Sequence, residues 1–334
     1  MILYADDIAL IIGAKDGKSM SHKGNLALKR IQATLNGLGL ELAADKTNAL
    51  IAHGKRTSIP KDTAFCLNGI TIRPGKEVKY LGITLDEDLN YRKHAERTCL
   101  KATRALNALA AILSAKTAKM ARRRVIARVI EGQLLYGCEV WMSRMASQAL
   151  NDMEVIQKRA AVRIVRGFPS MSGEAALVLA GMVPLTIQAK QRQEKFQGCK
   201  QQDKEDSMKA WQTRWERAEA AWTRNLIPQI KRWTTRTHGE LTSELTQILS
   251  GHGNFGTFLK MTKRKSCNLC PYCNTQETVR HQTMFCPRFD KERTTAGLQA
   301  ETDPRKIVTK MLTSTEAWNS VEQLARYICE AGKP

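Results

Sequence analysis

Two adjacent carboxylates near the start of the sequence are of a type that supports metal-dependent chemistry. Asp6 and Asp7 lie between two short apolar runs, Ile2-Leu3-Tyr4 and Ile8-Ala9-Leu10-Ile11-Ile12. Carboxylate oxygens are hard ligands for Mg²⁺, and two such ions can activate a 3′-hydroxyl and stabilise a departing pyrophosphate. Asp-Asp is also a common turn dipeptide. The pair therefore fits either a phosphoryl-transfer site or an ordinary turn.

The second candidate site is a cluster of cysteines around one histidine, formed by Cys267, Cys270, Cys273, His281 and Cys286. The last four residues have the spacing Cys-x2-Cys-x7-His-x4-Cys. This spacing predicts a closed tetrahedral Zn²⁺ site, which is structural because four protein ligands leave no position for water. Folding of the segment should then depend on the metal. Cys267 could replace Cys270, and free buried cysteines beside an incidental histidine are the simpler alternative.

Charge indicates the class of partner. The chain has 334 residues, of which 43% are hydrophobic, and its 53 Lys and Arg against 32 Asp and Glu give a net charge of +21. A chain of this size can bury a sizeable core, and so large an excess of positive charge favours a polyanionic partner or a membrane surface. Nucleic acid is the leading candidate.

Targeting signals are not apparent in the sequence. The first residues include Asp6 and Asp7 and no basic leader. No apolar run approaches the ~18 residues of a membrane-spanning helix. The remaining cysteines are scattered along the chain. We therefore expect an intracellular, reducing environment and no membrane partner.

The elements that must position the two aspartates are predicted to be a hairpin and a helix. The apolar runs around the acids form the hairpin, with the acids at its tip. Residues 25–38 have apolar side chains at helical spacing and should pack on it. A second β section, residues 65–85, has Asn68-Gly69 and Pro74-Gly75 as turn signals.

The rest of the chain is predicted to be helical up to the cysteine cluster. Residues 94–113 are rich in Ala and Leu without Gly or Pro, and residues 120–135 and 150–165 have a similar helical character. Trp211, Trp215 and Trp222 are spaced to lie near one helical face, where a core role is favoured over base stacking. A final helix is expected over residues 318–329. The predicted class is α+β, with segments 1–88, 89–185, 186–256, 257–295 and 296–334.

Three blocks in order resemble a known family. Tyr4-Ala5-Asp6-Asp7 between apolar strands, then residues 39–47 ending in Lys46-Thr47, then Val78-Lys79-Tyr80-Leu81-Gly82-Ile83 are similar to non-LTR (LINE-type) retrotransposon reverse transcriptases. The first 88 residues would be a partial polymerase palm. Residues 89–94 and 134–141 resemble the thumb-side segments, and the cysteine cluster resembles the knuckle near the C-terminus of these polyproteins.

The resemblance implies roles for individual residues. Asp6 and Asp7 would bind Mg²⁺, Lys46 would lie near the leaving pyrophosphate, and Tyr4 would line the substrate side. Tyr80, Leu81 and Gly82 would belong to the primer grip. The implied partners are an RNA template, a DNA primer or target and, in the full-length parent, deoxynucleotides; the implied location is the nucleus, with a cytoplasmic ribonucleoprotein stage.

Two groups of cations are candidates for phosphate contacts. Arg122, Arg123 and Arg124 lie in the thumb-like segment, and Lys263, Arg264 and Lys265 precede the knuckle, where aromatic residues accompany them. Contacts to the backbone charge suit a polymerase that is indifferent to sequence. Solvated helix faces are the alternative for each of them.

In the family, the third catalytic aspartate, the fingers and the endonuclease precede the Tyr-Ala-Asp-Asp turn. The chain therefore resembles a truncated polymerase, and we expect no polymerase activity from it in isolation. The alternative function is a non-enzymatic RNA- or DNA-binding remnant that works through the zinc knuckle. A basic helical scaffold without activity is the third possibility.

Overall fold

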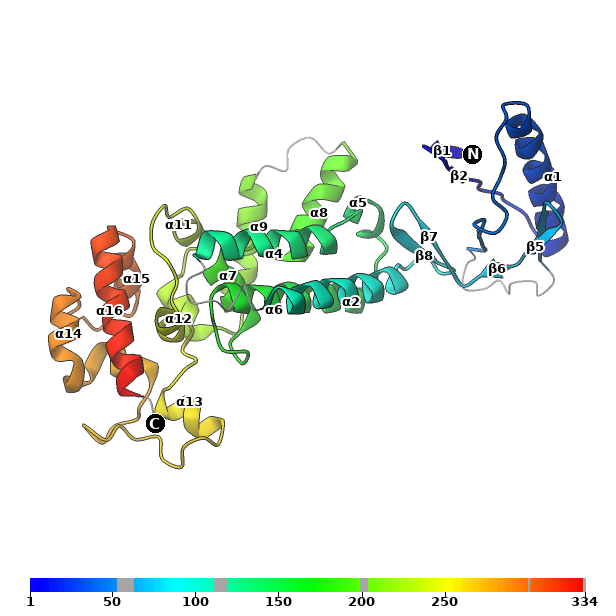
Figure 1. The fold of residues 1–334 in the computed structure, drawn as a ribbon. Helices are drawn as coiled ribbons and strands as arrows, with labels where there is room; N and C mark the ends of the chain where they lie inside the picture. Colours follow the sequence, from blue (N-terminus) through cyan, green and yellow to red (C-terminus); the bar gives the residue numbers. More distant parts are fainter. Residues whose placement is uncertain (53–62, 111–118, 199–203, 300, 333–334) are drawn as a thin grey trace. The chain divides into compact units, whose positions relative to one another are not determined.

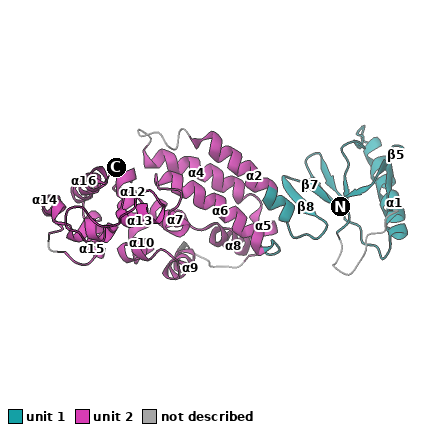
Figure 2. Cartoon of the chain, turned by 90° about the horizontal axis from the view of Figure 1, so that it is seen from below, with its two compact units in different colours: residues 1–96, 143–146 teal, residues 97–142, 147–334 magenta. Residues whose placement is uncertain are grey.

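The structure is a computed structural model that describes residues 1–52, 63–110, 119–198, 204–299 and 301–332. The chain divides into two compact units (Figure 2). Unit 1 comprises Met1–Glu96 with Ser143–Ala146, and unit 2 comprises Arg97–Met142 with Ser147–Pro334. Helices and short strands occur together (Figure 1), which agrees with the expected α+β class.

Unit 1 contains short strand pairs and one long helix. Its elements are β1 (Ile2–Tyr4), β2 (Asp7–Ala9), α1 (Gly17–Asn36), β3 (Ala49–Leu50), β4 (Phe65–Leu67), β5 (Ile70–Ile72), β6 (Pro74–Gly75), β7 (Glu77–Tyr80) and β8 (Ile83–Asp86). The described strands pair as β1–β2, β3–β6, β4–β5 and β7–β8.

The N-terminal hairpin predicted around the two acids is confirmed. β1 and β2 are antiparallel, and Tyr4 is paired with Asp7 across the turn. Ala5 has a positive φ of 51°, which closes the two-residue turn and leaves Asp6 at its tip. Both carboxylates are exposed.

The hairpin predicted at Asn68-Gly69 is also confirmed. Both residues have positive φ, 52° and 77°, as a type I′ turn requires. α1 packs chiefly on β4 rather than, as expected, on the N-terminal hairpin. The ring of Phe65 lies where a side chain on Gly24 would be, 2.4 Å from an ideal Cβ, so the glycine permits this close packing.

Pro74-Gly75 was wrongly predicted to be a turn. The two residues form β6, which pairs in parallel with Ala49–Leu50. This pairing is between segments distant in sequence, and local turn statistics do not contain it. The following hairpin, β7–β8, turns at Leu81 and Gly82, both with positive φ.

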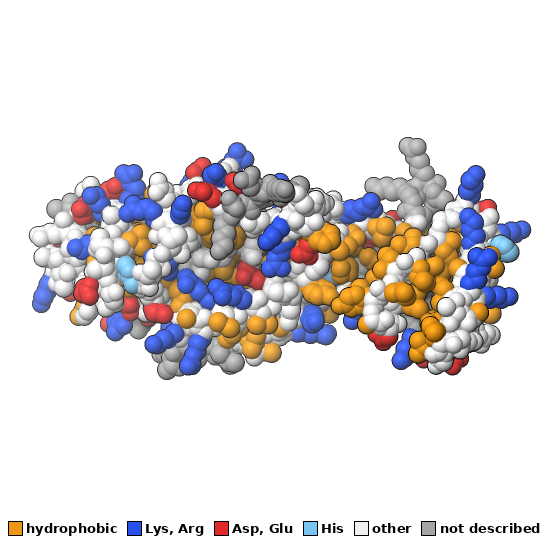
Figure 3. All heavy atoms as spheres, turned by 90° about the horizontal axis from the view of Figure 1, so that it is seen from above, with side chains coloured by type: hydrophobic (Ala, Val, Ile, Leu, Met, Phe, Trp, Pro, Cys, Tyr) orange, Lys and Arg blue, Asp and Glu red, His pale blue; other side chains and the backbone are white. Residues whose placement is uncertain are grey.

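Unit 1 buries little of its apolar surface among the described residues. One buried cluster consists of Ala44, Leu67 and Ile72. Large apolar side chains are exposed nearby, and Figure 3 shows them gathered over this unit. They include Ile2, Leu3, Tyr4, Ile11, Leu38 and Leu40.

Unit 2 is helical. Its elements are α2 (Arg92–Ala108, which begins in unit 1), α4 (Met120–Leu134), α5 (Cys138–Trp141), α6 (Ser147–Ile164), α7 (Gly173–Ala180), α8 (Leu185–Phe196), α9 (Lys204–Glu216), α10 (Ala221–Leu226), α11 (Ile230–Thr234), α12 (Ser243–Ser250), α13 (Gly256–Met261), the π-helical turn η1 (His281–Phe285), the 3-10 turn η2 (Pro287–Phe289), α14 (Asp290–Thr295), α15 (Arg305–Met311) and α16 (Thr315–Ala331). The part of the expected helix 94–113 after residue 110 lies outside the described residues.

One hydrophobic core runs through unit 2. α7 is apolar after Glu174 and buries every residue from Ala175 to Ala180, as expected of a helix enclosed by other elements. The same core includes Cys270 and Cys286 and continues to Ile328 on α16. The core contains residues of four segments that the sequence analysis treats separately: 89–185, 186–256, 257–295 and 296–334. The C-terminal helix, expected over 318–329, is confirmed as α16.

The tryptophans divide into two groups. Trp211 and Trp215 lie on α9 and are buried, so the expected core role is confirmed for both. The indole N–H of Trp215 donates a hydrogen bond to the carbonyl of Ile227 at 2.8 Å. Trp222 does not share their helical face, because α9 ends at Glu216 and Trp222 lies half-buried on α10.

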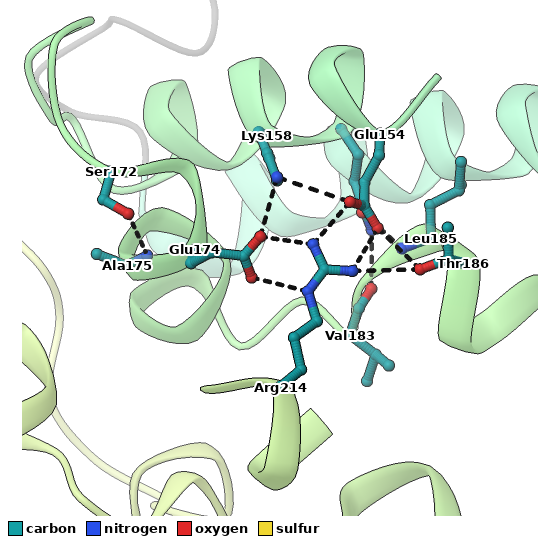
Figure 4. A network of polar contacts seen from close by, with 10 residues as sticks. Glu154, Lys158, Ser172, Glu174, Ala175, Val183, Leu185, Thr186 and Arg214 are labelled. Carbon is teal, nitrogen blue, oxygen red and sulfur yellow. Dashed lines mark hydrogen bonds and ion pairs between the residues drawn. The ribbon is translucent and has the colours of Figure 1, made fainter. Parts of the chain in front are cut away.

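An ion-pair network joins three helices of unit 2 (Figure 4). Arg214 on α9 donates to both oxygens of Glu154 on α6, at 2.8 and 2.6 Å, and to both oxygens of Glu174 on α7. Lys158 lies 2.9 Å from Glu174, and the Thr186 hydroxyl donates to Glu154. These contacts hold α9 against α6 and α7.

Candidate metal centre

Four potential metal ligands converge in the C-terminal part of unit 2. The ligand atoms of Cys270, Cys273, His281 and Cys286 all lie within 4.8 Å of one another. The two sulfurs of Cys270 and Cys286 are 3.8 Å apart, and Cys273 Sγ lies 3.0 Å from His281 Nε2. Zinc–sulfur bonds of ~2.3 Å at a tetrahedral angle give a sulfur–sulfur distance of ~3.8 Å. The donor set and its dimensions therefore fit Zn²⁺.

A tight turn presents the first two thiols. The backbone N–H of Cys270 donates to Thr275 O at 2.7 Å, and the N–H of Asn274 donates to Cys270 O at 2.9 Å. Asn274 adopts the left-handed conformation, with φ of 55°, a region that asparagine tolerates well. The chain thereby reverses between Cys270 and Thr275, and the sulfurs of Cys270 and Cys273 both lie in the cluster.

The other two ligands are brought together by η1. The N–H of Cys286 donates to His281 O at 2.8 Å, five residues back, which is the wide hydrogen-bonded turn of a π-helix. This closure places His281 and Cys286 above each other at the two ends of the turn. The Thr278 hydroxyl accepts the His281 N–H at 2.9 Å and fixes the start of the turn.

Neighbouring polar groups orient the ligands. Thr275 Oγ1 lies 3.2 Å from His281 Nδ1 and 3.3 Å from Nε2, so the hydroxyl sits at the edge of the ring whose Nε2 faces Cys273. Arg293 is buried and donates to the carbonyl of Cys286 at 2.6 Å. These contacts supply the outer shell that metal ligands in proteins require.

Burial sets the proton affinities of the site in the absence of metal. It raises the pKa of Cys286 to about 12, so that thiol stays protonated at neutral pH unless a cation displaces the proton. Burial lowers the pKa of His281, which favours the neutral imidazole that binds metals. A hydrogen bond from Thr275 lowers the pKa of Cys273.

Cys267 lies outside the cluster. Its side chain is exposed, whereas Cys270 is buried and within reach of the other three ligands. The geometry therefore selects Cys270 from the two alternatives that the spacing leaves open. With four protein ligands the site is closed, and it can stabilise the fold but cannot activate a water molecule.

A buried glutamate ties the metal loop to its surroundings. Glu277 accepts from Lys265 Nζ at 2.7 Å and from Gln282 Nε2 at 2.7 Å. Lys265 was predicted to contact nucleic acid, but in the structure it neutralises this carboxylate. Lys263 and Arg264, predicted for the same role, are exposed.

The candidate catalytic residues lie in unit 1. Asp6 and Asp7 are at the N-terminal hairpin, and Lys46 is exposed in a turn before β3. No hydrogen bond or ion pair joins these three side chains in the part of the chain that the structure describes. Among those residues, the cysteine–histidine cluster is the one group of three or more potential ligands, so the two aspartates have no third ligand there.

The other substrate-side candidates also lie on hairpins of unit 1. Tyr4 ends β1 and is exposed, which leaves the ring accessible. Tyr80 ends β7, and Leu81 and Gly82 form the turn that follows it. The hairpin expected for the primer grip is therefore present, and the role of its residues stays a prediction.

The three thumb-like arginines have different surroundings. Arg122 is exposed, whereas Arg123 is only 1% exposed and donates to the carbonyls of Ile164 and Leu241. The guanidinium of Arg123 is enclosed by the core, which argues against the predicted phosphate contact. Arg124 is half-buried and donates to Ala180 O at 3.1 Å, and burial lowers its pKa.

Sequence reasoning missed the residues that support the metal site. Thr275, Glu277 and Arg293 each contact a ligand or its loop, as described above. A hydroxyl between the second cysteine and the histidine is a usable signal for Thr275, since such groups commonly orient a ligand. Arg293 follows the last cysteine by seven residues and carries no comparable signal.

The fold and site together define a basic, mainly helical chain with a closed Cys-Cys-His-Cys cluster. The chain is 23% identical over 329 residues to a retrovirus-related Pol polyprotein from type-1 retrotransposable element R1 of Bradysia coprophila, covering 89% of this chain and 32% of the relative. It is 22% identical to the Pol polyprotein from element R1 4 of Nasonia vitripennis, covering 98% of this chain and 94% of the relative.

A further relative extends the comparison to another element. The chain is 28% identical over 160 residues to the probable RNA-directed DNA polymerase from transposon BS of Drosophila melanogaster, covering 47% of this chain and 17% of the relative. No protein-family model matches the chain, and no solved structure matches it significantly.

The chain is a homologue of Pol polyproteins of R1 non-LTR retrotransposons. Its relatives indicate a family of retrotransposon RNA-directed DNA polymerases. The chain spans about a third of the length of the Bradysia relative, 32%. None of the described helices is both long and apolar enough to cross a lipid bilayer.

Proposed function

We propose that the chain holds nucleic acid for a retrotransposon RNA-directed DNA polymerase. The observation that carries this proposal is its similarity to R1 Pol polyproteins along most of its length, together with a net charge of +21. So large a positive charge suits a polyanion, and contacts to phosphates need no base sequence. The partners would be an RNA template and a DNA primer or target, met in the nucleus.

Residues 267–286, which carry the four metal ligands and are called the zinc module below, supply part of the proposed binding surface. Lys260, Lys263 and Arg264 are exposed just before it, and the rings of Tyr272 and Phe285 are exposed beside its ligands. Exposed rings between cations are suited to unpaired bases and their phosphates. When bound, the metal would fix the conformation of the backbone that carries or adjoins these side chains.

In the full-length parent, Asp6 and Asp7 would contribute to an Mg²⁺ site for nucleotidyl transfer, with Lys46 beside the pyrophosphate and Tyr80, Leu81 and Gly82 in the primer grip. The described residues supply two adjacent carboxylates and no third one near them. We therefore propose that the isolated chain binds nucleic acid without polymerising deoxynucleotides. The alternative function is that of a non-enzymatic RNA- or DNA-binding protein. In that case the nucleic acid is bound without any role in polymerisation.

The first test is a salt titration of RNA binding by the full zinc-loaded chain, measured by fluorescence anisotropy. We expect the logarithm of affinity to fall linearly with the logarithm of salt concentration, by about 0.7 to 0.9 for each phosphate contact. Asp6→Asn should leave the affinity unchanged, because binding does not use the catalytic metal. Affinity that is independent of salt would contradict the proposal.

A primer-extension assay with Mg²⁺ separates the two functional classes. We expect no incorporation of deoxynucleotides by the isolated chain. If incorporation occurs and is lost in Asp6→Asn, the isolated chain is itself a polymerase that uses Asp6, and the proposal of binding without polymerisation fails.

A pair of neighbouring arginines gives a sharper prediction for the helical surface. Arg122→Ala should reduce the salt dependence by about one contact, because this side chain is exposed. Arg123→Ala should leave the salt dependence unchanged but lower the free energy of unfolding by about 2 kcal/mol, because two buried carbonyls lose their donor. Anisotropy and chemical denaturation measure the two effects. The reverse pattern would mean that Arg123 reaches the nucleic acid.

A further inference from the structure

A groove of about 1400 Å³ is open on unit 2 beside the zinc module. It is lined by residues of α9, α10 and α11, by residues at the start of α15 and by Arg280, which directly precedes the ligand His281. Figure 2 shows α9, α10 and α15 along one edge of the unit. Small-molecule sites typically have volumes of ~300–1,000 Å³. The groove is larger, as an extended chain molecule would need.

One tryptophan is held in the wall of this groove. Trp222 donates its indole N–H to Ile248 O at 2.7 Å, and its ring is only partly covered. An ideal Cβ on Gly251 would lie 3.1 Å from Trp222 Cδ1, so the glycine allows the ring to seat closely against the end of α12. The other five tryptophans are buried. Trp222 is thus an ordered aromatic surface that adjoins the groove.

The helices around Trp222 are also fixed in place. Gln212 on α9 donates to Pro228 O at 2.9 Å and accepts from Ile230 N at 3.0 Å. These two bonds tie α9 to the start of α11, and Gln212 and Pro228 both line the groove. A preformed groove binds with less loss of conformational freedom than one that must be ordered first.

The charge of the lining is positive. The basic side chains are Lys209, Arg224, Lys231, Arg280 and Arg305, and the acidic ones are Glu205, Glu216 and Asp303. Arg305 is paired with Asp303 at 2.8 Å, Lys231 lies 3.7 Å from Glu205, and Lys209 lies 3.7 Å from Asp206. Arg280 is exposed, and no ion pair to it occurs among the described residues; its guanidinium lies 5.6 Å from the ring of Phe285. This leaves Arg280 available to an anion.

We infer that this groove binds a single strand of nucleic acid, with a base stacked on Trp222 and a backbone phosphate held by Arg280. The inference rests on the proposed function and names the form of nucleic acid and the place where it binds. A stacking face is available to an unpaired base but not to a base inside a duplex. The groove would carry a strand from the helices of unit 2 to the zinc module.

The experiment uses the full zinc-loaded chain with oligo(U), oligo(dT), the corresponding duplex and an oligoglutamate peptide. Single strands should bind more tightly than the duplex and quench part of the tryptophan fluorescence. Trp222→Phe keeps a ring, so affinity should stay within about twofold while the quenching disappears. Trp222→Leu should weaken single-strand binding about tenfold.

Arg280→Gln tests the same groove without disturbing a packed residue. It should weaken single-strand binding and lower the salt slope by about 0.7, the value for one phosphate contact on a single strand. Lys190→Gln is the matched control, because Lys190 is exposed on α8 and does not line the groove. It should leave both affinity and slope unchanged. Thermal melting of each variant shows whether the fold is retained.

The outcomes separate this inference from the proposed function. If the chain binds single strands but Trp222→Leu and Arg280→Gln bind as tightly as wild type, the groove is not the site and the proposed function stands. If the chain binds no nucleic acid, both fail. Preference for the oligoglutamate peptide over either oligonucleotide would overturn the inference in favour of an acidic protein partner.

Discussion

Cys286→Ser is expected to remove zinc from the chain and to unfold the C-terminal part of unit 2. Cys286 is fully buried in the main core, and its loss leaves three ligands for a site that needs four. Structural zinc contributes about 10 kcal/mol or more of apparent folding free energy in small metal modules. This is comparable with the entire stability of a typical domain, about 5–15 kcal/mol. Zinc content should fall from about one ion per chain to nearly none.

Cys267→Ser is the matched control for that substitution. Cys267 lies three residues before Cys270 but is exposed and outside the cluster. Its variant should keep its zinc and melt at the wild-type temperature. Metal analysis and thermal melting of both variants, before and after chelation, measure the effect. Loss of zinc in Cys267→Ser with retention in Cys270→Ser would show that Cys267, and not Cys270, is the ligand.

The metal centre was predictable because its ligands are local. All four lie within one short segment, and their residue types and spacing suffice to identify them. What surrounds them was not predictable in the same way. Arg293 reaches the Cys286 carbonyl only because α14 packs back against η1, and that packing depends on the core rather than on local spacing.

The hairpins of unit 1 illustrate the same distinction. Asn68-Gly69 specifies its turn through the positive φ that both residues tolerate, so the turn follows from the dipeptide. Pro74-Gly75 carries an equally strong turn signal, but a parallel pairing with Ala49–Leu50 determines its structure. The competing interaction comes from a segment more than twenty residues away, which turn chemistry does not describe.

The burial of Arg123 could have been inferred from the sequence. Along α4 the buried residues are Met120, Arg123, Ala127, Ile130 and Leu134. Their spacing of three and four residues is the core-facing stripe of a helix, and Arg123 lies within it. Reading three adjacent arginines as a single charged patch ignored that successive helical residues point in different directions.

Helical spacing does not predict the contacts of Arg214, because they join residues of different helices. Removing them is expected to cause a large loss of folding stability. Arg214→Leu should lower the free energy of unfolding by about 4 kcal/mol. Glu154, which is 4% exposed, would lose both hydrogen bonds from the guanidinium, and Glu174 would lose its partner on α9. A buried carboxylate without its partner carries a desolvation cost that Lys158 alone does not offset. Chemical denaturation measures the loss.

The same substitution should change the pH dependence of stability. Burial alone would raise the pKa of Glu154, but the hydrogen bonds and charge of Arg214, with help from Lys158, lower it below the ordinary value of 4.5. In wild type, Glu154 therefore stabilises the fold above about pH 4.5, and that contribution is lost as pH falls through the lowered pKa. In Arg214→Leu, burial raises the pKa instead. The stability difference between the two proteins should thus be largest at neutral pH and narrow as the pH approaches 4.5.

Arg326→Leu provides a matched control, since it removes an arginine from the same unit. Arg326 is largely exposed and lies 3.5 Å from Glu322 on the same helix, an arrangement worth less than about 1 kcal/mol. The control should therefore lose little stability, and its difference from wild type should depend far less on pH. If Arg214→Leu loses no more than this control, the hydrogen bonds of Figure 4 do not hold α9 in place, and the wall of the groove that carries Lys209 and Gln212 must be stabilised by the tryptophans of the core instead.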